Sequence, residues 1–215
     1  MIAYALLLLR RYPRRPGGQL ALVMATVFPA TGAILWRLSF DPRKLAPDGE
    51  SIFAALALVD GSLAVANLIA ASIQDERDRS RSRLLRTGNL DGVRAVVSYL
   101  AVANVLAASF TLLALLLPAI VLLGVVPAAA WLPCLAVALY VAASGALGIW
   151  VGYLVPRTLR PVCATLAAWG PLGVLPYSQI LVIPAGRGML LWVGTHALCL
   201  FVLAPIWRRT SSVLW

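Results

Sequence analysis

The sequence predicts an all-α integral membrane protein with six transmembrane helices, and two observations carry that prediction. Hydrophobic residues make up 61% of the 215 residues and charged residues only 12%, whereas about a quarter of an ordinary soluble domain is charged. The apolar residues fall in runs of about 20, the length that crosses a hydrocarbon core of roughly 30 Å as a helix. We therefore expect a single transmembrane domain over residues 1–215.

The chain divides into an N-terminal segment, two spans, a charged loop at 74–92 and four further spans. Residues 1–16 begin apolar and end basic, so we expect a helix along the inner membrane surface. A frayed start to the first span is the alternative. The first two predicted spans are 19–38 and 51–73. The other four lie within 93–215. They are 93–123, which breaks at Pro118, then 129–154, then a fifth span from Val162 that Gly170 and Pro171 interrupt, and finally 189–207.

Basic residues are distributed unequally between the two sides of the predicted bundle. With the N-terminus inside, the inner set is Arg10, Arg11, Arg14, Arg15, Arg77, Arg79, Arg81, Arg83, Arg86, Arg94, Arg157, Arg160, Arg208 and Arg209, and the outer set is Arg37, Arg43, Lys44 and Arg187. Cytoplasmic loops of membrane proteins carry such an excess, so we expect both termini in the cytoplasm and an even number of spans. This orientation signal explains the net charge of +10 better than a nucleic-acid partner does.

Aromatic residues fall near the ends of the predicted spans. The outer ends carry Trp36 and Trp131, and the inner ends carry Tyr99, Trp150, Tyr153 and Trp207. Tyrosine and tryptophan rings have one apolar body and one polar tip, so they favour the membrane–water interface. Their placement supports the same six spans.

A strongly charged stretch interrupts the apolar sequence. Residues 74–83, QDERDRSRSR, contain no apolar side chain, and acids precede arginines, an order that suits a helix dipole and ion pairs along one helix. Leu84 and Leu85 then add one apolar spot before Gly88, a natural helix stop. We expect a short, independent, water-exposed helix over 74–88 that docks a partner. A solvated hairpin that only keeps its loop inside is the alternative.

The segment ERDRSRSRLLRTGNL, residues 76–90, resembles the signature of ABC exporter permeases of the second type. That signature has a glutamate at the end of the second span, paired leucines eight and nine residues later, and a Thr-Pro or similar step before the third span. The matching residues are Glu76, Leu84, Leu85 and Thr87, whereas Ser80 replaces the commonest glycine and Gly88 the commonest proline. The predicted layout of spans and termini resembles the same family over the whole chain.

In that family, the loop after the second span is a coupling helix that sits in a groove of a cytoplasmic ATPase. The resemblance therefore implies a separate ATP-binding cassette subunit that binds ATP and Mg, and a homodimer or a paired second permease. It also implies a place in the bacterial cytoplasmic membrane. The residues to which it gives ATPase coupling are Glu76, Arg77, Arg79, Arg83, Leu84, Leu85 and Thr87.

Motifs for chemistry within this chain are absent from the sequence. It contains no phosphate-binding G-x-x-x-x-G-K-[ST] loop, no H-E-x-x-H motif and no nucleophile elbow. Three cysteines, Cys134, Cys163 and Cys199, lie in apolar segments without metal-ligand spacing, so we interpret them as small buried hydrophobic residues. We expect no cofactor or metal bound directly, and no enzymatic activity of the chain by itself.

Two ionisable residues inside predicted spans are candidates for a translocation path, Asp60 and His196. A carboxylate within the bilayer is costly, so Asp60 either lines a path, protonates, or pairs with Arg37, His196 or another helix. A lone histidine in a span more often makes one hydrogen bond than it binds metal or carries protons. The small residues of 142–148, AASGALG, predict a helix-packing face rather than a substrate contact.

Together these features predict the permease subunit of an ATP-driven exporter. The scarcity of buried charge favours an amphipathic or lipid-like substrate, moved out of the cytoplasm or the inner leaflet. A secondary transporter or channel is one alternative, although paired half-repeats with matching broken helices are expected for it. A non-transporting membrane scaffold that recruits a cytoplasmic partner through the charged loop is the other.

Overall fold

The computed structural model describes residues 5, 6, 9, 10, 19, 23, 47–78, 92–117, 120, 131–173 and 185–207. The elements in this part of the chain are all helices, which confirms the predicted all-α class. Apart from Gln19 and Val23, the predicted first span lies outside the described residues, and so does 79–91, most of the charged loop.

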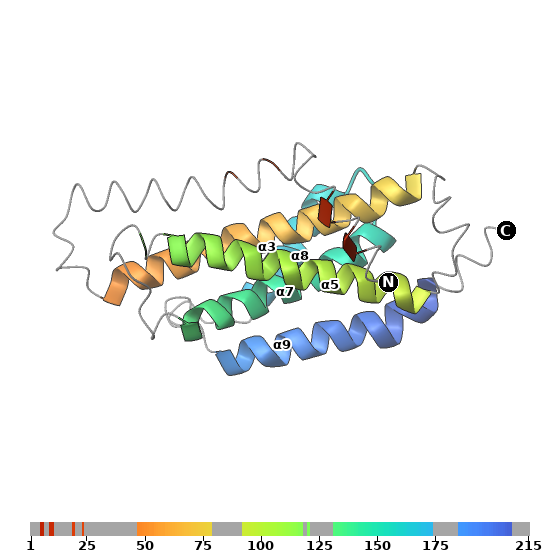
Figure 1. Cartoon of the computed structure of the whole chain (residues 1–215). Coiled ribbons are helices and arrows are strands. Elements are labelled where there is room, and N and C mark those ends of the chain that lie inside the picture. The colour runs from red at the N-terminus through yellow and green to blue at the C-terminus, as the bar shows by residue number, and fades with distance from the viewer. Residues whose placement is uncertain are drawn as a thin grey trace.

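Four long helices lie side by side along the molecule (Figure 1). They are α3 (Pro47–Asp78), α5 (Gly92–Thr111), α7 (Trp131–Leu154) and α9 (Ala185–Leu198). Helix α5 runs opposite to the other three (Figure 1). Two π-helical turns extend these helices, η3 (Leu112–Leu116) after α5 and η6 (Cys199–Leu203) after α9.

Four continuous helical segments are long and apolar enough to cross a membrane. Two lie within α3 and α7, Ala57–Asp75 and Cys134–Leu154. The other two join α5 to η3, Gly92–Leu116, and α9 to η6 and the helical residues after it, Ala185–Trp207. The fifth helix, α8 (Arg160–Gly173), has only 14 residues. At 1.5 Å per residue it is about 21 Å long, shorter than a hydrocarbon core of roughly 30 Å. The membrane-spanning character is thus supported for four of the six predicted spans.

Two predicted helix boundaries are wrong. Helix α8 does not break at Gly170 and Pro171 but continues to Gly173. Pro171 stands in the last turn, where its missing N–H costs one helix hydrogen bond, the one to the Ala167 carbonyl. Helix α9 begins at Ala185, four residues before the predicted start, because an apolar environment favours helix even through glycines.

Helix α7 forms the centre of the bundle, because its glycines let α3 approach closely. A Cβ atom added at Gly148 would lie 2.6 Å from the Ala66 carbonyl oxygen, and one at Gly152 would lie 2.8 Å from the Ala70 carbonyl oxygen. Only glycine permits such contact between helix backbones. The prediction of a packing face at 142–148 is confirmed by this geometry.

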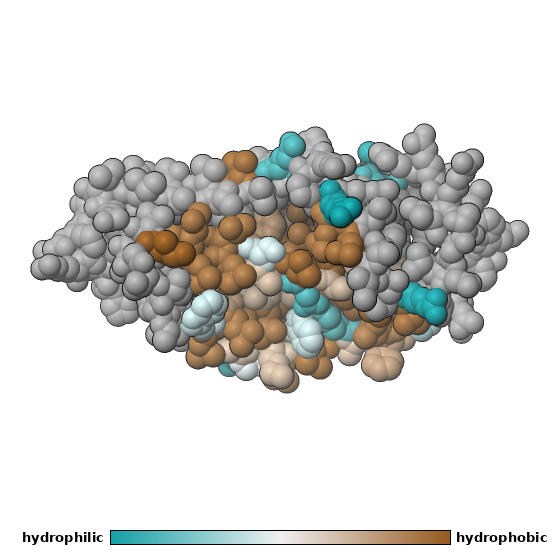
Figure 2. All heavy atoms as spheres, in the orientation of Figure 1, coloured by the Kyte–Doolittle hydropathy of each residue, from teal (hydrophilic) through white to brown (hydrophobic). Residues whose placement is uncertain are grey.

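Large apolar side chains cover much of the described surface (Figure 2). On α8 and α9 the most exposed include Leu166, Leu190 and Phe201, with 66%, 75% and 80% of their surface accessible. Exposed apolar patches of this extent are rare on soluble proteins and indicate contact with a membrane or a partner. The apolar surface therefore agrees with the membrane protein that the composition predicts.

One end of the bundle carries an aromatic cluster. The ring centroids of Tyr153 and Trp207 are 4.6 Å apart and stacked, and those of Tyr99 and Trp207 are 6.1 Å apart. Trp131 starts α7 at the opposite end and is 53% exposed. The predicted grouping of these four rings at span ends is confirmed, while which end faces the cytoplasm stays a prediction.

The described residues of the N-terminal segment are helical and contact the bundle. Ala5 and Leu9 pack against the main hydrophobic core, whereas Leu6 is 54% exposed. Spacing of four residues puts Ala5 and Leu9 on one helix face. That residues 1–16 lie along the inner membrane surface stays a prediction.

Candidate functional site

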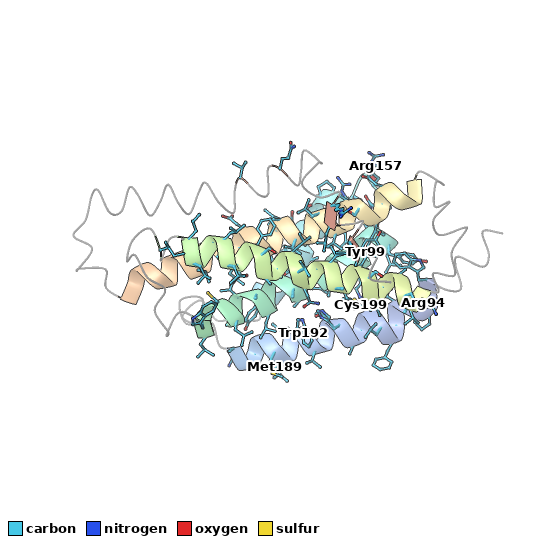
Figure 3. All side chains as sticks on the ribbon, viewed as in Figure 1. Arg94, Tyr99, Arg157, Met189, Trp192 and Cys199 are labelled. Atoms are coloured by element: carbon cyan, nitrogen blue, oxygen red, sulfur yellow. The ribbon has the colours of Figure 1, made fainter. Side chains whose placement is uncertain are left out.

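A polar cluster joins α5 and α9 within the otherwise apolar bundle. The Trp192 indole N–H donates to Asn104 Oδ1 at 2.7 Å, and Asn104 Nδ2 lies 2.9 Å from His196 Nε2. The Trp192 and His196 rings are 4.5 Å apart at their centroids. Figure 3 shows Trp192 on the side of α9 that faces the bundle, and Met189 on the opposite side.

The partners of His196 fix its tautomer. Its Nδ1 lies 2.8 Å from the Trp192 carbonyl oxygen, which can only accept, so Nδ1 carries the proton. Its Nε2 then accepts from the Asn104 amide, whose other N–H donates to the Leu100 carbonyl at 2.7 Å. Every polar atom of the two side chains has a partner, so the cluster acts as a neutral bond between two helices.

This geometry settles part of the expectation for His196. The histidine makes structural hydrogen bonds, as the sequence favoured. Of the alternatives for Asp60, pairing with His196 is not seen, because both ring nitrogens have other partners. Sequence reasoning missed Asn104 and Trp192. The signal for Asn104 was an amide within a predicted span, where polar side chains commonly bond across helices.

Asp60 lies near the middle of α3. It is partly buried and makes no hydrogen bond or ion pair with the described residues. The neighbouring Gly61 packs against α7, since a Cβ atom added there would lie 3.1 Å from Val141 Cγ2. Pairing with Arg37 falls outside the described residues, and the role of Asp60 in a path stays a prediction.

The charged stretch begins as a continuation of α3 and not as a separate helix. Helix α3 runs without a break through residues 74–78. Gln74 is only 3% exposed and its amide donates to the Val155 carbonyl at 2.8 Å. The prediction of an independent, water-exposed helix starting at Gln74 is therefore wrong at this end. Its neighbours in the sequence were too polar to suggest burial.

The predicted coupling residues are only partly covered by the structure. Glu76 and Arg77 lie in the last turn of α3. The others lie outside the described residues: Arg79, Arg83, Leu84, Leu85 and Thr87. Their predicted role in docking an ATPase is neither supported nor contradicted by the fold.

A short turn between α7 and α8 faces the end of α3. Helix α7 ends at Leu154, and the N–H groups of Leu159 and Arg160 both bond the Pro156 carbonyl at 3.1 Å. Arg94 and Arg157 occupy this end of the bundle (Figure 3), while Arg187 lies in the first turn of α9 at the other end. The unequal charge seen in the sequence is thus retained among these described arginines.

Metal chemistry finds no support in the described part of the chain. No group of three histidine, cysteine or acidic side chains there is arranged to hold an ion. Cys134 and Cys199 are buried, and the Cys199 thiol donates to the Ala146 carbonyl at 3.4 Å.

No family model, curated protein or solved structure matches this chain.

Proposed function

We propose that this chain is the transmembrane permease subunit of an ATP-driven ABC exporter in the bacterial cytoplasmic membrane. Two copies, or this chain and a second permease, enclose the path, and a separate subunit binds and hydrolyses ATP with Mg. The substrate is amphipathic or lipid-like and leaves from the cytoplasm or the inner leaflet. The chain itself is not an enzyme.

The observation that carries the proposal is the end of α3. A single helix of 32 residues leads from an apolar span directly into the charged stretch. A continuous helix transmits displacement along its axis better than a flexible loop does, so a partner that moves the stretch also moves the span. The resemblance of residues 76–90 to the coupling segment of these exporters supports an ATPase as that partner.

The proposal is tested at the paired leucines that follow the charged stretch. Interface energy concentrates in a few desolvated apolar groups, and burying one leucine contributes roughly 1.5–3 kcal/mol. We expect Leu84→Ala/Leu85→Ala to weaken ATPase docking by several kcal/mol while membrane insertion is unchanged. The measurements are co-purification of the ATPase subunit with the tagged chain, and ATPase activity stimulated by substrate.

The matched control is Leu190→Ala, which truncates an exposed leucine on the surface of α9. It should leave the recovery of the ATPase unchanged. Normal recovery and normal stimulation with the double variant would show that Leu84 and Leu85 do not dock an ATPase and that the charged stretch after α3 is only a solvated connection. Recovery of a partner without a nucleotide-binding site would favour the membrane scaffold instead.

A further inference from the structure

The end of α3 is attached to a distant part of the chain through one side chain. Gln74 Nε2 donates to the Val155 carbonyl across 81 residues of sequence. Gln74 is 3% exposed, although the residues that follow it are the most polar of the chain. A buried amide at the start of a charged stretch needs a reason, because an exposed glutamine there would avoid the cost of desolvation.

The Val155 carbonyl is the group that needs this donor. In a continuing α-helix it would accept from the N–H of residue 159. That N–H bonds the Pro156 carbonyl instead, at 3.1 Å, because the chain turns after Leu154. Gln74 therefore satisfies a carbonyl released by the end of α7. Its own Oε1 has no hydrogen-bond partner among the described residues, so in this part of the chain one hydrogen bond holds the amide.

Close packing lies directly behind this hydrogen bond. A Cβ atom added at Gly152 would lie 2.8 Å from the Ala70 carbonyl oxygen and 2.9 Å from Ile73 Cβ. Ala70 also belongs to a small buried cluster with Val151 of α7 and Ala164 of α8. One closely packed block is therefore formed by the last turns of α3 and α7 and the first turns of α8.

We propose that Gln74 is a positioning residue that makes this block move as one body. Displacement of the charged stretch then reaches α8 through the Gln74–Val155 bond, in addition to moving α3. This inference rests on the proposed function, because it assigns the charged stretch a partner that displaces it. It adds a route into the second half of the chain that the coupling segment alone does not provide.

Cys163 is a native reporter for this block. It packs against the small buried cluster and is partly exposed, whereas Cys134 and Cys199 are 5% and 0% exposed. Its reaction with a maleimide, located by peptide mass, follows the seating of α8 on α3 and α7. The measurement uses the purified full chain alone, so its result does not depend on an ATPase partner.

We expect Gln74→Met to raise the labelling rate of Cys163 about fivefold to tenfold, as for the loss of one net hydrogen bond. Gln74→Glu keeps the shape of the side chain but removes the N–H donor, so it should raise the labelling rate by a similar factor. It replaces the methionine variant if that variant folds poorly. The matched control is Asn67→Met on the same helix, whose amide donates to the Leu63 carbonyl within α3 at 2.9 Å and bonds no other helix among the described residues. It should leave the labelling rate unchanged. An unchanged labelling rate in both Gln74 variants would overturn the proposal that Gln74 holds the block together.

The second arm measures substrate exported per ATP hydrolysed in the reconstituted complex. Gln74→Met should retain the ATPase subunit and its hydrolysis but export several-fold less substrate per ATP, while Asn67→Met keeps the ratio. Faster Cys163 labelling with an unchanged ratio would overturn the transmitting role. A chain that never recovers an ATPase would overturn the proposed function, and the labelling result would still decide whether the block exists.

Discussion

Helices α7 and α9 are both apolar enough to span a membrane, but they are held in the bundle in different ways. Within an 18-residue apolar window of each span, 72% of the residues are buried in Cys134–Leu154, against 28% in Ala185–Trp207. Helix α7 buries small residues against its neighbours. Helix α9 exposes large ones, including Leu190 and Phe201.

The difference shows what can hold helices together in a bilayer. Lipid tails are as apolar as leucine, so hydrophobicity alone does not draw one span to another. Helix α7 relies on backbone contact at Gly148 and Gly152. Helix α9 also packs a glycine on α7, since a Cβ atom added at Gly188 would lie 3.0 Å from Tyr140 Cε2. It adds polar contacts, through Asn104 to α5 and, in η6, through Cys199 to the Ala146 carbonyl of α7. We interpret α7 as the fixed centre and α9 as the more easily displaced helix.

The strongest test of this difference between α7 and α9 places a large side chain in the contact between α3 and α7. Gly148→Leu would place a side chain where the Ala66 backbone lies, at 2.6 Å from a Cβ atom, so the helices must separate. We expect a loss of about 3 kcal/mol of stability, the upper end of the usual range for overpacking, and little folded protein. The control is Gly194→Leu on α9, where an added Cβ meets nothing within 4 Å. Folded yield by gel filtration should fall only for Gly148→Leu, and equal yields would refute the central role of α7.

The second test removes the polar attachment of α9. Asn104→Leu leaves the Trp192 indole N–H and His196 Nε2 without their partner. We expect a loss of about 0.6–2 kcal/mol, the range for hydrogen bonds between membrane helices. Asn67→Leu makes the same substitution at an amide that, among the described residues, bonds only within α3, so it should cost less. The measurement is thermal unfolding in detergent, and equal costs for the two variants would mean that the cluster does not attach α9.

A third test compares large side chains on the two helices. Phe201 is 80% exposed on η6, whereas Ile149 is fully buried on α7. We expect Phe201→Ala to change stability by less than about 0.5 kcal/mol. Ile149→Ala should cost about 2–5 kcal/mol through the cavity it leaves. Unfolding midpoints in the same detergent check both values, and a large loss from Phe201→Ala would indicate a protein partner covering α9.

The smallest expected effect on stability is at Asp60, beside the α3–α7 contact. Asp60 makes no hydrogen bond or ion pair with the described residues, so Asp60→Asn should leave the folded yield nearly unchanged. If it lines a path, as proposed for the exporter, transport should change by several-fold. Reduced yield would place a structural contact at Asp60 instead. Unchanged yield and transport would remove it from both roles.

The sequence predicted those features that depend on composition and local pattern. The end of α7 at Leu154, the packing face at 142–148 and the aromatic span ends all follow from apolar length, small residues and interfacial rings. Each of these signals is present within one segment of the chain. The six-span count stays a prediction, since four candidate spans are seen in the described part.

What the sequence could not predict depends on contacts between distant segments. The burial of Gln74 requires the turn at Val155, and the state of His196 requires Asn104 of another helix. In an almost uniformly apolar helix, periodicity carries little information about which face meets which neighbour. The passage of α8 through Pro171 was missed for a similar reason, because local helix-breaking tendency was outweighed by the surrounding helices.

The π-helical turn η6 changes the direction in which the end of α9 points. Eleven residues make about three turns of an α-helix, so in a regular helix Trp207 would lie almost directly below His196. A π turn adds one residue and rotates everything after it by about 100°. His196, before the π turn, bonds Asn104 of α5, whereas Trp207, after it, stacks on Tyr153 of α7 and lies 6.1 Å from Tyr99 of α5. The extra residue therefore changes the register of the helix, so that Trp207 does not lie on the same helix face as His196.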